Sequence, residues 1–288
     1  MTDEAATVFI AICRNGIPIK GTLVTGNLSL KRGLAVLDVL RNADEPLGVR
    51  EIARRLELSA PAVQRILNTL AERDYVEQVP VSRRYRLGYS VLTLAQHIMH
   101  KDRLVGLVEP ELRALAAEDC FNAFLGLRRS NRGIYLLTVQ SRSPVVIRSS
   151  PGETFPLHST ALGKALLIGH GAEQVLAILG EGLLERLTPR TVTEPDRLIA
   201  QIKTAEKIGY TTSLDENFPG LLAVGAPLRD ATGTTIAAIS VAYPRSVGPQ
   251  VVIAEVGEIV MAAAARISAN LGYVGRGGAK RKEPSHAA

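Results

Sequence analysis

Apolar residues recur at helical spacing three times near the start of the chain. One face of residues 28–40 is apolar, and the pattern returns over residues 49–57 after a polar turn at 42–48. A third repeat starts at Ser59, a favourable helix N-cap, with Pro61 in the first turn, where the missing amide hydrogen costs little. The pattern predicts three short amphipathic helices joined by tight turns.

The third predicted helix carries polar side chains opposite its apolar face. At 100° per residue, Gln64, Arg65 and Asn68 lie on the outer side of this helix together with Pro61. Amide and guanidinium side chains pair with base edges in the major groove of DNA. Two short helices joined by a tight turn, the second of them polar on its outer face, favour a helix-turn-helix.

Two short strand-like stretches, 75–79 and 85–87, follow the third helix. They flank a turn that carries Arg83 and Arg84, which is typical of a wing whose tip reaches the DNA backbone or the minor groove. The predicted DNA-contacting residues are Arg50, Arg54, Arg83 and Arg84 at the phosphates, Gln64, Arg65 and Asn68 at the bases, and Ser59 and Pro61 at the start of the reading helix.

Beyond residue 89 the chain alternates helical and strand-like stretches. Asp230–Gly233 separates two of the strands and gives a hairpin signal, and Pro110 is expected to mark a boundary or a kink in a helix. Antiparallel pairs mixed with helices indicate an α+β fold. The predicted helices are 90–100, 104–117, 158–169, 173–179, 195–208 and 251–271, and the predicted strands are 121–128, 133–139, 145–148, 222–229 and 234–243.

The length of 288 residues suggests about two domains, and an apolar content of 46% is enough to form cores. The net charge of +6 is unevenly distributed along the chain. Residues 28–88 carry 11 bases and 8 acids, residues 89–270 carry 17 of each, and residues 271–288 carry 4 bases and 1 acid. A basic block joined to a neutral body indicates a polyanion-binding module attached to a second function.

Composition also excludes several classes of protein. The two cysteines lie far apart in sequence and form neither a disulfide framework nor a cysteine-rich zinc site. The chain has no run of about 18 apolar residues and no signal-peptide pattern at its start. His97 and His100 have no third metal ligand nearby in sequence. We therefore expect a cytoplasmic protein with no membrane partner and without a bound metal or cofactor.

Three polar groupings in the body match catalytic motifs only in part. Lys164 lacks the glycine and the hydroxyl residue that a phosphate-binding loop requires, so we expect it to fix a loop or form a salt bridge. His158 and Ser159 are adjacent and rarely face each other, and no nucleophile elbow is present. Asp215 and Glu216 form a pair of acids of the kind used in acid/base chemistry, but we expect them to lie in a loop beside a pocket. We predict that the protein is not an enzyme. The two alternatives are that the C-terminal body is an enzyme, or that it is an assembly module that binds no ligand.

Several ordered motifs resemble one known family. They are SLKRGLAVLDVL (29–40), VREIARRLELSAPAVQRILNTL (49–70), DYVEQ (74–78), YRLGYSVLTLA (85–95), PLHSTALGKALL (156–167), LTPRTVTEPDRL (187–198), IGYTTSLDENFPG (208–220) and AVGAPLRDATGTTIAAISVA (223–242). In order and spacing over residues 28–271 they resemble IclR-type bacterial transcriptional regulators. The resemblance implies a winged helix-turn-helix domain, a linker helix, an effector domain with a GAF-like sheet, and dimers or tetramers on double-stranded operator DNA.

The resemblance also implies a domain organisation and a site for a small-molecule carboxylate effector. We expect a flexible arm at 1–27, a winged helix-turn-helix at 28–90, a linker helix at 91–106, an effector-binding domain at 107–271 and a disordered basic tail at 272–288. In the family the ligand lies between the sheet and the helix that opens near residue 160. The matching positions are Ile147, Phe155, Ala161, Leu162, Ser213, Ala223, Ser240 and Ala242.

The chain departs from the family pattern at three of these positions. Similar members that bind very small oxo-acids carry Asp at position 213, Cys at 223 and Ser at 242, where this chain has Ser213, Ala223 and Ala242. The expected pocket is therefore less polar and favours an aromatic or medium-sized carboxylate. Free amide groups at Ala161 and Leu162, near a helix start, are expected to accept the carboxylate.

Overall fold

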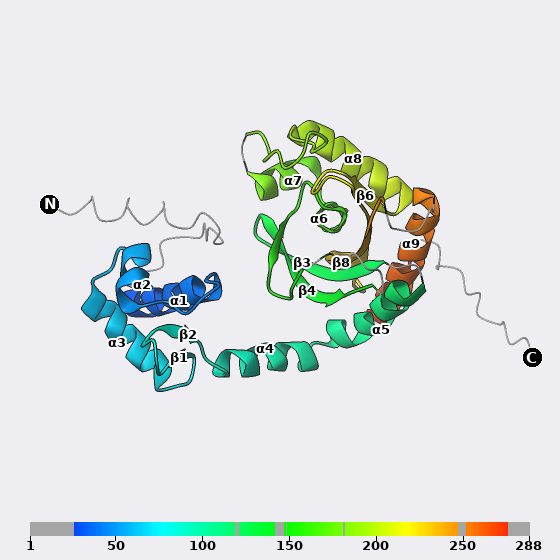
Figure 1. Ribbon diagram of the computed structural model, residues 1–288. Helices are drawn as coiled ribbons and strands as arrows, with labels where there is room; N and C mark the ends of the chain where they lie inside the picture. The colour runs from blue at the N-terminus through cyan, green and yellow to red at the C-terminus, as the bar shows by residue number, and fades with distance from the viewer. Residues whose placement is uncertain are drawn as a thin grey trace, which may run out of the picture. The chain divides into compact units, whose positions relative to one another are not determined.

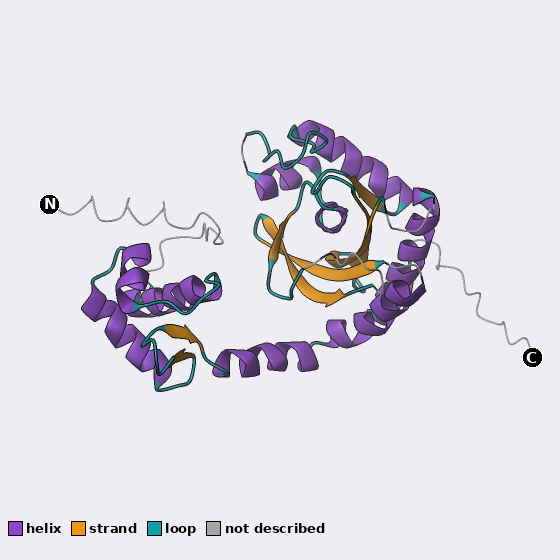
Figure 2. Cartoon of the chain, viewed as in Figure 1, coloured by secondary structure: helices purple, strands orange, loops and turns teal. Residues whose placement is uncertain are grey.

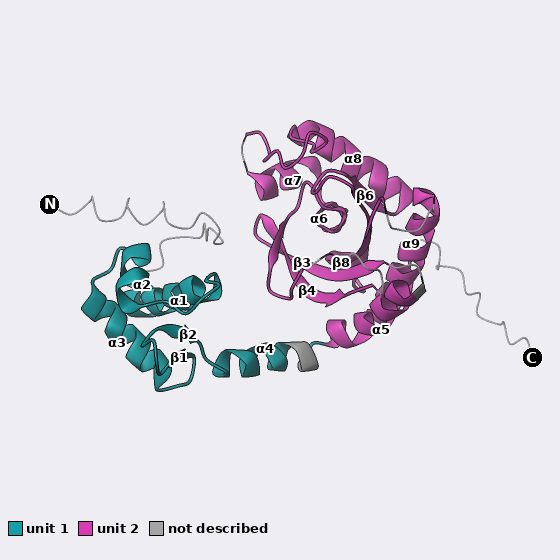
Figure 3. Cartoon of the chain, in the orientation of Figure 1, with its two compact units in different colours: residues 1–102 teal, residues 103–288 magenta. Residues whose placement is uncertain are grey.

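The computed structural model describes residues 26–118, 121–141, 147, 149–180, 182–246 and 252–275. Helices and strands alternate along the chain (Figures 1 and 2). The chain divides into two compact units, residues 1–102 (unit 1) and residues 103–288 (unit 2) (Figure 3). The predicted arm at 1–27 and the predicted tail at 272–288 fall mostly outside the described residues.

Unit 1 is a three-helix bundle followed by a two-stranded hairpin. Its elements are α1 (Leu28–Arg41), α2 (Val49–Leu56), α3 (Ala60–Ala71), β1 (Val76–Gln78), β2 (Tyr85–Leu87) and α4 (Ser90–Lys101). The apolar faces predicted from the sequence meet in one core, because each short helix buries its apolar face against the other two. That core contains Val36, Leu40, Leu47, Ile52, Ala53, Val63, Leu67, Val76 and Tyr85.

The turn between α2 and α3 is closed by main-chain hydrogen bonds. Glu57 ends α2 in the left-handed region with a φ of 53°, and the Leu58 amide donates to Ala53 O over 2.9 Å. Such a left-handed residue satisfies the last carbonyl groups of a helix and redirects the chain. Ser59 occupies the N-cap of α3, as predicted, but its hydroxyl makes no capping hydrogen bond.

The wing is attached to the helices through its second strand. β1 and β2 pair antiparallel, with Gln78 opposite Tyr85. On its other side, Tyr85 pairs with Leu47 from the α1–α2 connection, with N–O distances of 2.8 and 2.9 Å. Tyr85 is only 5% exposed. The position of this residue is therefore fixed by β1 on one side and by the α1–α2 connection on the other.

Unit 2 is built on a six-stranded antiparallel sheet in the order β5-β4-β3-β8-β7-β6. Its strands are β3 (Asn122–Arg129), β4 (Arg132–Val139), β5 (Thr154–Pro156), β6 (Thr211–Leu214), β7 (Leu221–Arg229) and β8 (Thr235–Pro244). Its helices are α5 (Arg103–Glu118), α6 (Ala161–Ala165), α7 (Ala172–Leu179), α8 (Pro195–Ile208) and α9 (Ile253–Asn270).

Helices cover both faces of this sheet. Successive residues of a strand point to opposite faces, yet almost all of β8 is buried, from Ala237 through Tyr243. On one face the short helix α6 packs against β3, β6, β7 and β8, inside the curl of the sheet (Figure 1). α5 packs against β3 and β4, and α9 packs against β7 and β8. The α6 side of the sheet is the surface on which the predicted ligand positions lie.

The structure corrects some predicted elements. The helix expected at 158–169 is shorter, because Thr160 caps α6 and residues 158–160 belong to the preceding turn. α5 runs through Pro110, which lies on its exposed side, where water can hydrate the carbonyl group that the proline leaves free. The short strands β5 and β6 were not predicted. The strand expected at 145–148 lies almost wholly outside the described residues.

The separate cores predict that a cavity in one unit destabilises that unit. Ile52 in unit 1 and Ile239 in unit 2 are both fully buried. Truncation of either to alanine should lower the free energy of unfolding of its own unit by about 2–5 kcal/mol. Hydrogen exchange resolved by peptide measures each unit within the full chain. Leu34→Ala, at a 54% exposed position, is the control and should have little effect. If either isoleucine variant lowered the protection of both units equally, the two cores would not be separate.

Candidate nucleic-acid interface and ligand site

The outer face of α3 carries the side chains predicted to read bases. Pro61, Arg65 and Asn68 are exposed, whereas Gln64 is half-buried. The buried residues of the helix, Val63 and Leu67, lie on the opposite side. Helical periodicity therefore identified the exposed face correctly but did not show that Gln64 turns partly inward.

Gln64 is held in place by two hydrogen bonds. Its Nε2 donates to Asn68 Oδ1 over 2.8 Å, one turn along the same helix, and to the Tyr85 hydroxyl over 2.9 Å. Tyr85 is a residue of the candidate interface that sequence reasoning missed. The two partners lie 21 residues apart, so no local pattern links them.

Arg65 lies apart from this pair, on the flank of α3 that faces α1. It lines a groove of about 430 Å³ together with Leu30 and Arg32 of α1 and Ile66 of α3. Its guanidinium group has no hydrogen-bond or ion-pair partner among the described residues. Arg65 is therefore accessible, but it is separated from the Gln64–Asn68 pair around the helix.

The predicted phosphate contacts differ in their availability. Arg50 and Arg54 of α2 and Arg83 of the wing are exposed, and their guanidinium groups have no ion-pair or hydrogen-bond partner within the described part of the chain. Arg84 donates to Pro46 O over 3.3 Å. By contrast, Arg55 pairs with Glu51 over 2.7 Å. The positive charge of Arg55 is therefore partly neutralised by a neighbour on its own helix. The unpaired guanidinium groups thus lie on α2 and at the wing tip, on either side of α3 in sequence.

In unit 2, the strand register brings three predicted ligand positions into one row. Ser213 of β6 lies opposite Ala223 of β7, and Ala223 lies opposite Ala242 of β8. Directly opposed residues of neighbouring strands project from the same face of a sheet. Ser240, two residues before Ala242, lies on this face as well and is opposite Gly225.

α6 lies directly above this row. A Cβ atom on Gly225 would lie only 2.8 Å from Ala161 O, so only glycine permits so close an approach. The Thr211 hydroxyl donates to Ala161 O over 2.7 Å. Close to it, Leu162 and the Phe155 ring pack over Gly126 of β3. These contacts place Ala161, Leu162 and Phe155 on the same side of the sheet as the row, and Ile147 packs against the same apolar cluster.

Two amide groups at the start of α6 have no hydrogen-bond acceptor among the described residues. Thr160 is the N-cap, and its hydroxyl accepts a hydrogen bond from the Gly163 amide over 2.9 Å. The amides of Ala161 and Leu162 have no acceptor among the described residues. The first amides of a helix have no intrahelical partner, so these two donors remain unused.

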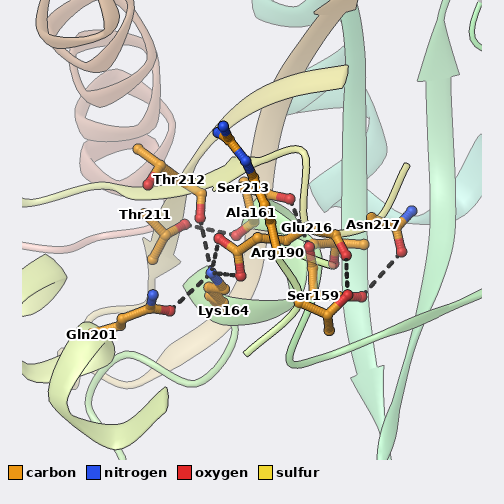
Figure 4. Close-up of polar contacts among 12 residues, drawn as sticks. Ser159, Ala161, Lys164, Arg190, Gln201, Thr211, Thr212, Ser213, Glu216 and Asn217 are labelled. Carbon is orange, nitrogen blue, oxygen red and sulfur yellow. Dashed lines mark hydrogen bonds and ion pairs between the residues drawn. The ribbon is translucent and has the colours of Figure 1, made fainter. Parts of the chain in front are cut away.

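Ser213 makes a hydrogen bond that determines what it offers to a ligand. Its hydroxyl donates to Ser159 O over 2.6 Å, and the Ser159 hydroxyl in turn donates to Asn217 Oδ1 over 3.0 Å (Figure 4). The only hydrogen of the Ser213 hydroxyl is thus directed at the chain, so it presents lone pairs to its surroundings.

A buried ion pair connects α6 to the sheet and to α8. Lys164 Nζ lies 2.6 and 2.7 Å from the two carboxylate oxygens of Glu216, and it also donates to Gln201 Oε1 and Thr212 O (Figure 4). The Lys164 side chain is 3% exposed. Burial lowers the pKa of Lys164, and the Glu216 carboxylate opposes this shift. The salt bridge expected at Lys164 is present, and Glu216 is its partner.

The loop that carries Glu216 is tied to a second loop. Thr191 donates to Glu216 O and Thr188 to Asp215 O, each over 2.7 Å. The Asp215 carboxylate pairs with Arg190 over 3.2 Å and with Arg245 over 2.5 Å. The β6–β7 loop, the segment before α8 and the start of α6 thus form one polar network beside the candidate ligand site.

The groupings that partly matched catalytic motifs serve other contacts. His158 Nε2 lies 2.9 Å from Glu185 O, and burial lowers the pKa of this histidine. Ser159 bonds to Asn217 rather than to His158. Among the described residues, no group of three His, Cys, Asp or Glu side chains is placed to hold a metal. None of the helices in that part of the chain is long and apolar enough to cross a membrane.

Comparison with known proteins agrees with this arrangement. The family model "Bacterial transcriptional regulator IclR C-terminal" matches residues 96–269, and the "IclR helix-turn-helix domain" matches residues 29–80. The transcriptional regulator BhcR of Paracoccus denitrificans is 30% identical over 76% of this chain and 78% of its own length. The transcriptional repressor AllR of Escherichia coli is 27% identical over 86% of this chain and 91% of its own.

Solved structures with a similar fold include a regulator with the same family name. The IclR transcriptional regulator from Alicyclobacillus acidocaldarius is 27% identical and superimposes with a TM-score of 0.76. The match covers 86% of this chain and 100% of that one. The similarity therefore extends over both units.

Breaking the Lys164–Glu216 pair should destabilise unit 2. Lys164→Met leaves the Glu216 carboxylate buried without its cation, which should lower the free energy of unfolding by about 3–5 kcal/mol in urea denaturation. The double variant Lys164→Met/Glu216→Leu should recover most of this loss. The control is Arg197→Met, because the exposed Arg197–Glu194 pair contributes at most about 1 kcal/mol. An equal loss in the single and double variants would contradict this account.

Proposed function

This chain belongs to the IclR family of bacterial transcriptional regulators, and we propose that it binds operator DNA as a dimer or tetramer and senses an aromatic or medium-sized carboxylate. The observation that carries the DNA-binding part is the exposed polar face of α3, accompanied by the unpaired Arg50, Arg54 and Arg83. Guanidinium groups without an internal partner are free to neutralise phosphates. The basic surplus of unit 1, 11 bases against 8 acids over residues 28–88, acts in the same direction.

Two features of unit 2 support the proposed ligand. The sheet surface under α6 is mostly apolar, with Ala223 and Ala242 at its centre. The unused amides of Ala161 and Leu162 lie above it and can donate hydrogen bonds to a carboxylate. An apolar floor opposite two amide donors suits a molecule with a carboxylate at one end and an apolar body.

The proposed regulation is a shift between two arrangements of the oligomer. A ligand that binds one arrangement of unit 2 more tightly changes the population of that arrangement. If the two arrangements hold the two copies of α3 at different separations, operator affinity changes, because half-site spacing must match the protein. Ligand and operator would then influence each other's affinity by the same factor.

Arginine substitutions should separate phosphate contacts from base contacts. Arg83→Ala should weaken binding to operator and to random DNA alike. It should also reduce the slope of log K against log salt concentration by about 1, because one fewer counterion is released. Arg65→Ala should instead relax operator discrimination, by about 1–3 kcal/mol. Fluorescence anisotropy on both kinds of duplex measures the two effects. Arg55→Ala, at a residue already paired with Glu51, is the matched control; an equal loss on random DNA would assign Arg65 to the backbone.

Calorimetry on the full chain should show the ligand preference. Benzoate-type acids should bind more tightly than glyoxylate or pyruvate, because the row of Ser213, Ala223 and Ala242 offers few polar partners. The triple variant S213D/A223C/A242S should reverse this preference, whereas Ser246→Asp, at an exposed position, should leave it unchanged. Tighter binding of glyoxylate or pyruvate to the wild-type chain would refute the proposed ligand class.

A further inference from the structure

We propose that Tyr85 of the wing is a positioning residue that holds the side-chain amides of Gln64 and Asn68 in the orientation that they present to DNA. This inference rests on the proposed DNA-binding function and names its specificity. With Tyr85 in place, α3 presents an acceptor at Gln64 and a donor at Asn68.

The Tyr85 phenol is a fixed reference point. Its residue is 5% exposed and belongs to the core of unit 1. Its main chain is hydrogen-bonded on one side to Leu47 and lies in register with Gln78 on the other. A tyrosine held in this way keeps its ring in one place, so the hydroxyl has a defined position beside α3.

The hydroxyl takes up one of the two hydrogens of the Gln64 amide. Gln64 Nε2 lies 2.9 Å from Tyr85 Oη and 2.8 Å from Asn68 Oδ1. An amide nitrogen has two hydrogens, so both donors of Gln64 are used inside the protein. What remains is Gln64 Oε1, an acceptor without a partner among the described residues.

Asn68 has the complementary arrangement. Its Oδ1 accepts from Gln64, while its Nδ2 has no acceptor among the described residues and the side chain is exposed. The two hydrogens of Nδ2 are available to an acceptor on the DNA. The pair therefore presents one acceptor and one donor, separated by one helical turn.

This pairing changes the bases that the helix can read. A free Asn or Gln contacts adenine with both groups, accepting from N6 and donating to N7. Gln64 cannot do so here, because both hydrogens of its amide are already used. Gln64 can accept from the exocyclic amine of adenine or cytosine, and Asn68 can donate to the acceptors of adenine, guanine or thymine. Four residues of helix rise about 6 Å and a base step about 3.4 Å, so the two bases lie one to two steps apart.

The fixed orientation also favours binding. An amide that is already oriented loses little rotational freedom when it meets its base. Without the hydroxyl, Gln64 can rotate and present either end, so discrimination between donor and acceptor bases should fall while the phosphate contacts stay the same.

The test uses duplexes that the wild-type chain selects from random-sequence DNA. For Tyr85→Phe, which keeps the buried ring, discrimination against single base-pair changes at the positions facing α3 should fall on the order of tenfold. Affinity for random DNA and its salt dependence should be unchanged. Tyr89→Phe, at a 74% exposed tyrosine in the same unit, is the matched control and should leave discrimination intact.

A double-variant comparison separates positioning from a general structural effect. In a Gln64→Ala background, Tyr85→Phe should cause no further loss of discrimination, because the group that it positions is gone. At the base pair where Gln64→Ala loses discrimination, an analogue that lacks the exocyclic amine of adenine or cytosine should weaken wild-type binding about as much as Gln64→Ala does. The same analogue should not weaken binding by Gln64→Ala any further. An unchanged affinity of the wild-type chain for this analogue would overturn the proposed orientation.

Other outcomes distinguish this inference from the function on which it rests. If the wild-type chain selects no sequence at all, the proposed function fails and this inference fails with it. If the wild type selects an operator and Tyr85→Phe discriminates equally well, only the role of Tyr85 is overturned. Equal weakening on all DNA would likewise reject positioning.

Discussion

The buried ammonium group of Lys164 is the constraint on which the candidate ligand site of unit 2 depends. A lysine side chain that is 3% exposed is stable only when its charge is neutralised and its hydrogens are accepted. Glu216, Gln201 and Thr212 provide the acceptors, and they come from the β6–β7 loop, α8 and β6. Satisfying this one cation therefore draws three segments together around α6. The same contacts hold the start of α6 over the row of small residues on the sheet.

A similar relation exists in unit 1 on a smaller scale. The buried Tyr85 ring is part of the core, and its hydroxyl accepts a hydrogen bond from the half-buried Gln64. In both units a buried residue thus orients polar groups at the candidate functional surface. Such groups are oriented before the ligand or DNA arrives, which reduces the entropy lost on binding. The two units have separate cores, and each core lies beneath its own candidate site.

Periodicity and local signals predicted much of this architecture. α8 begins and ends at Pro195 and Ile208, as predicted, because its apolar stripe is continuous and a proline and a glycine mark its ends. β5 and β6 were missed because three or four residues are too few to show alternation. The partners of Gln64 and Lys164 could not be predicted from spacing. Tyr85 lies 21 residues from Gln64, and Glu216 lies 52 residues from Lys164, so only the folded chain brings each pair together.

We expect unit 1 to recognise a specific DNA sequence, and a carboxylate bound by unit 2 to change this recognition. The most direct measurement is fluorescence anisotropy with DNA from the region upstream of the protein's own gene, with and without a saturating benzoate-type acid. We expect binding roughly a thousandfold or more tighter than to random DNA, as is typical of a specific regulator, and a severalfold change in the operator Kd with the acid. Equal affinity for both DNAs, or an operator Kd unaffected by every such acid, would contradict this expectation.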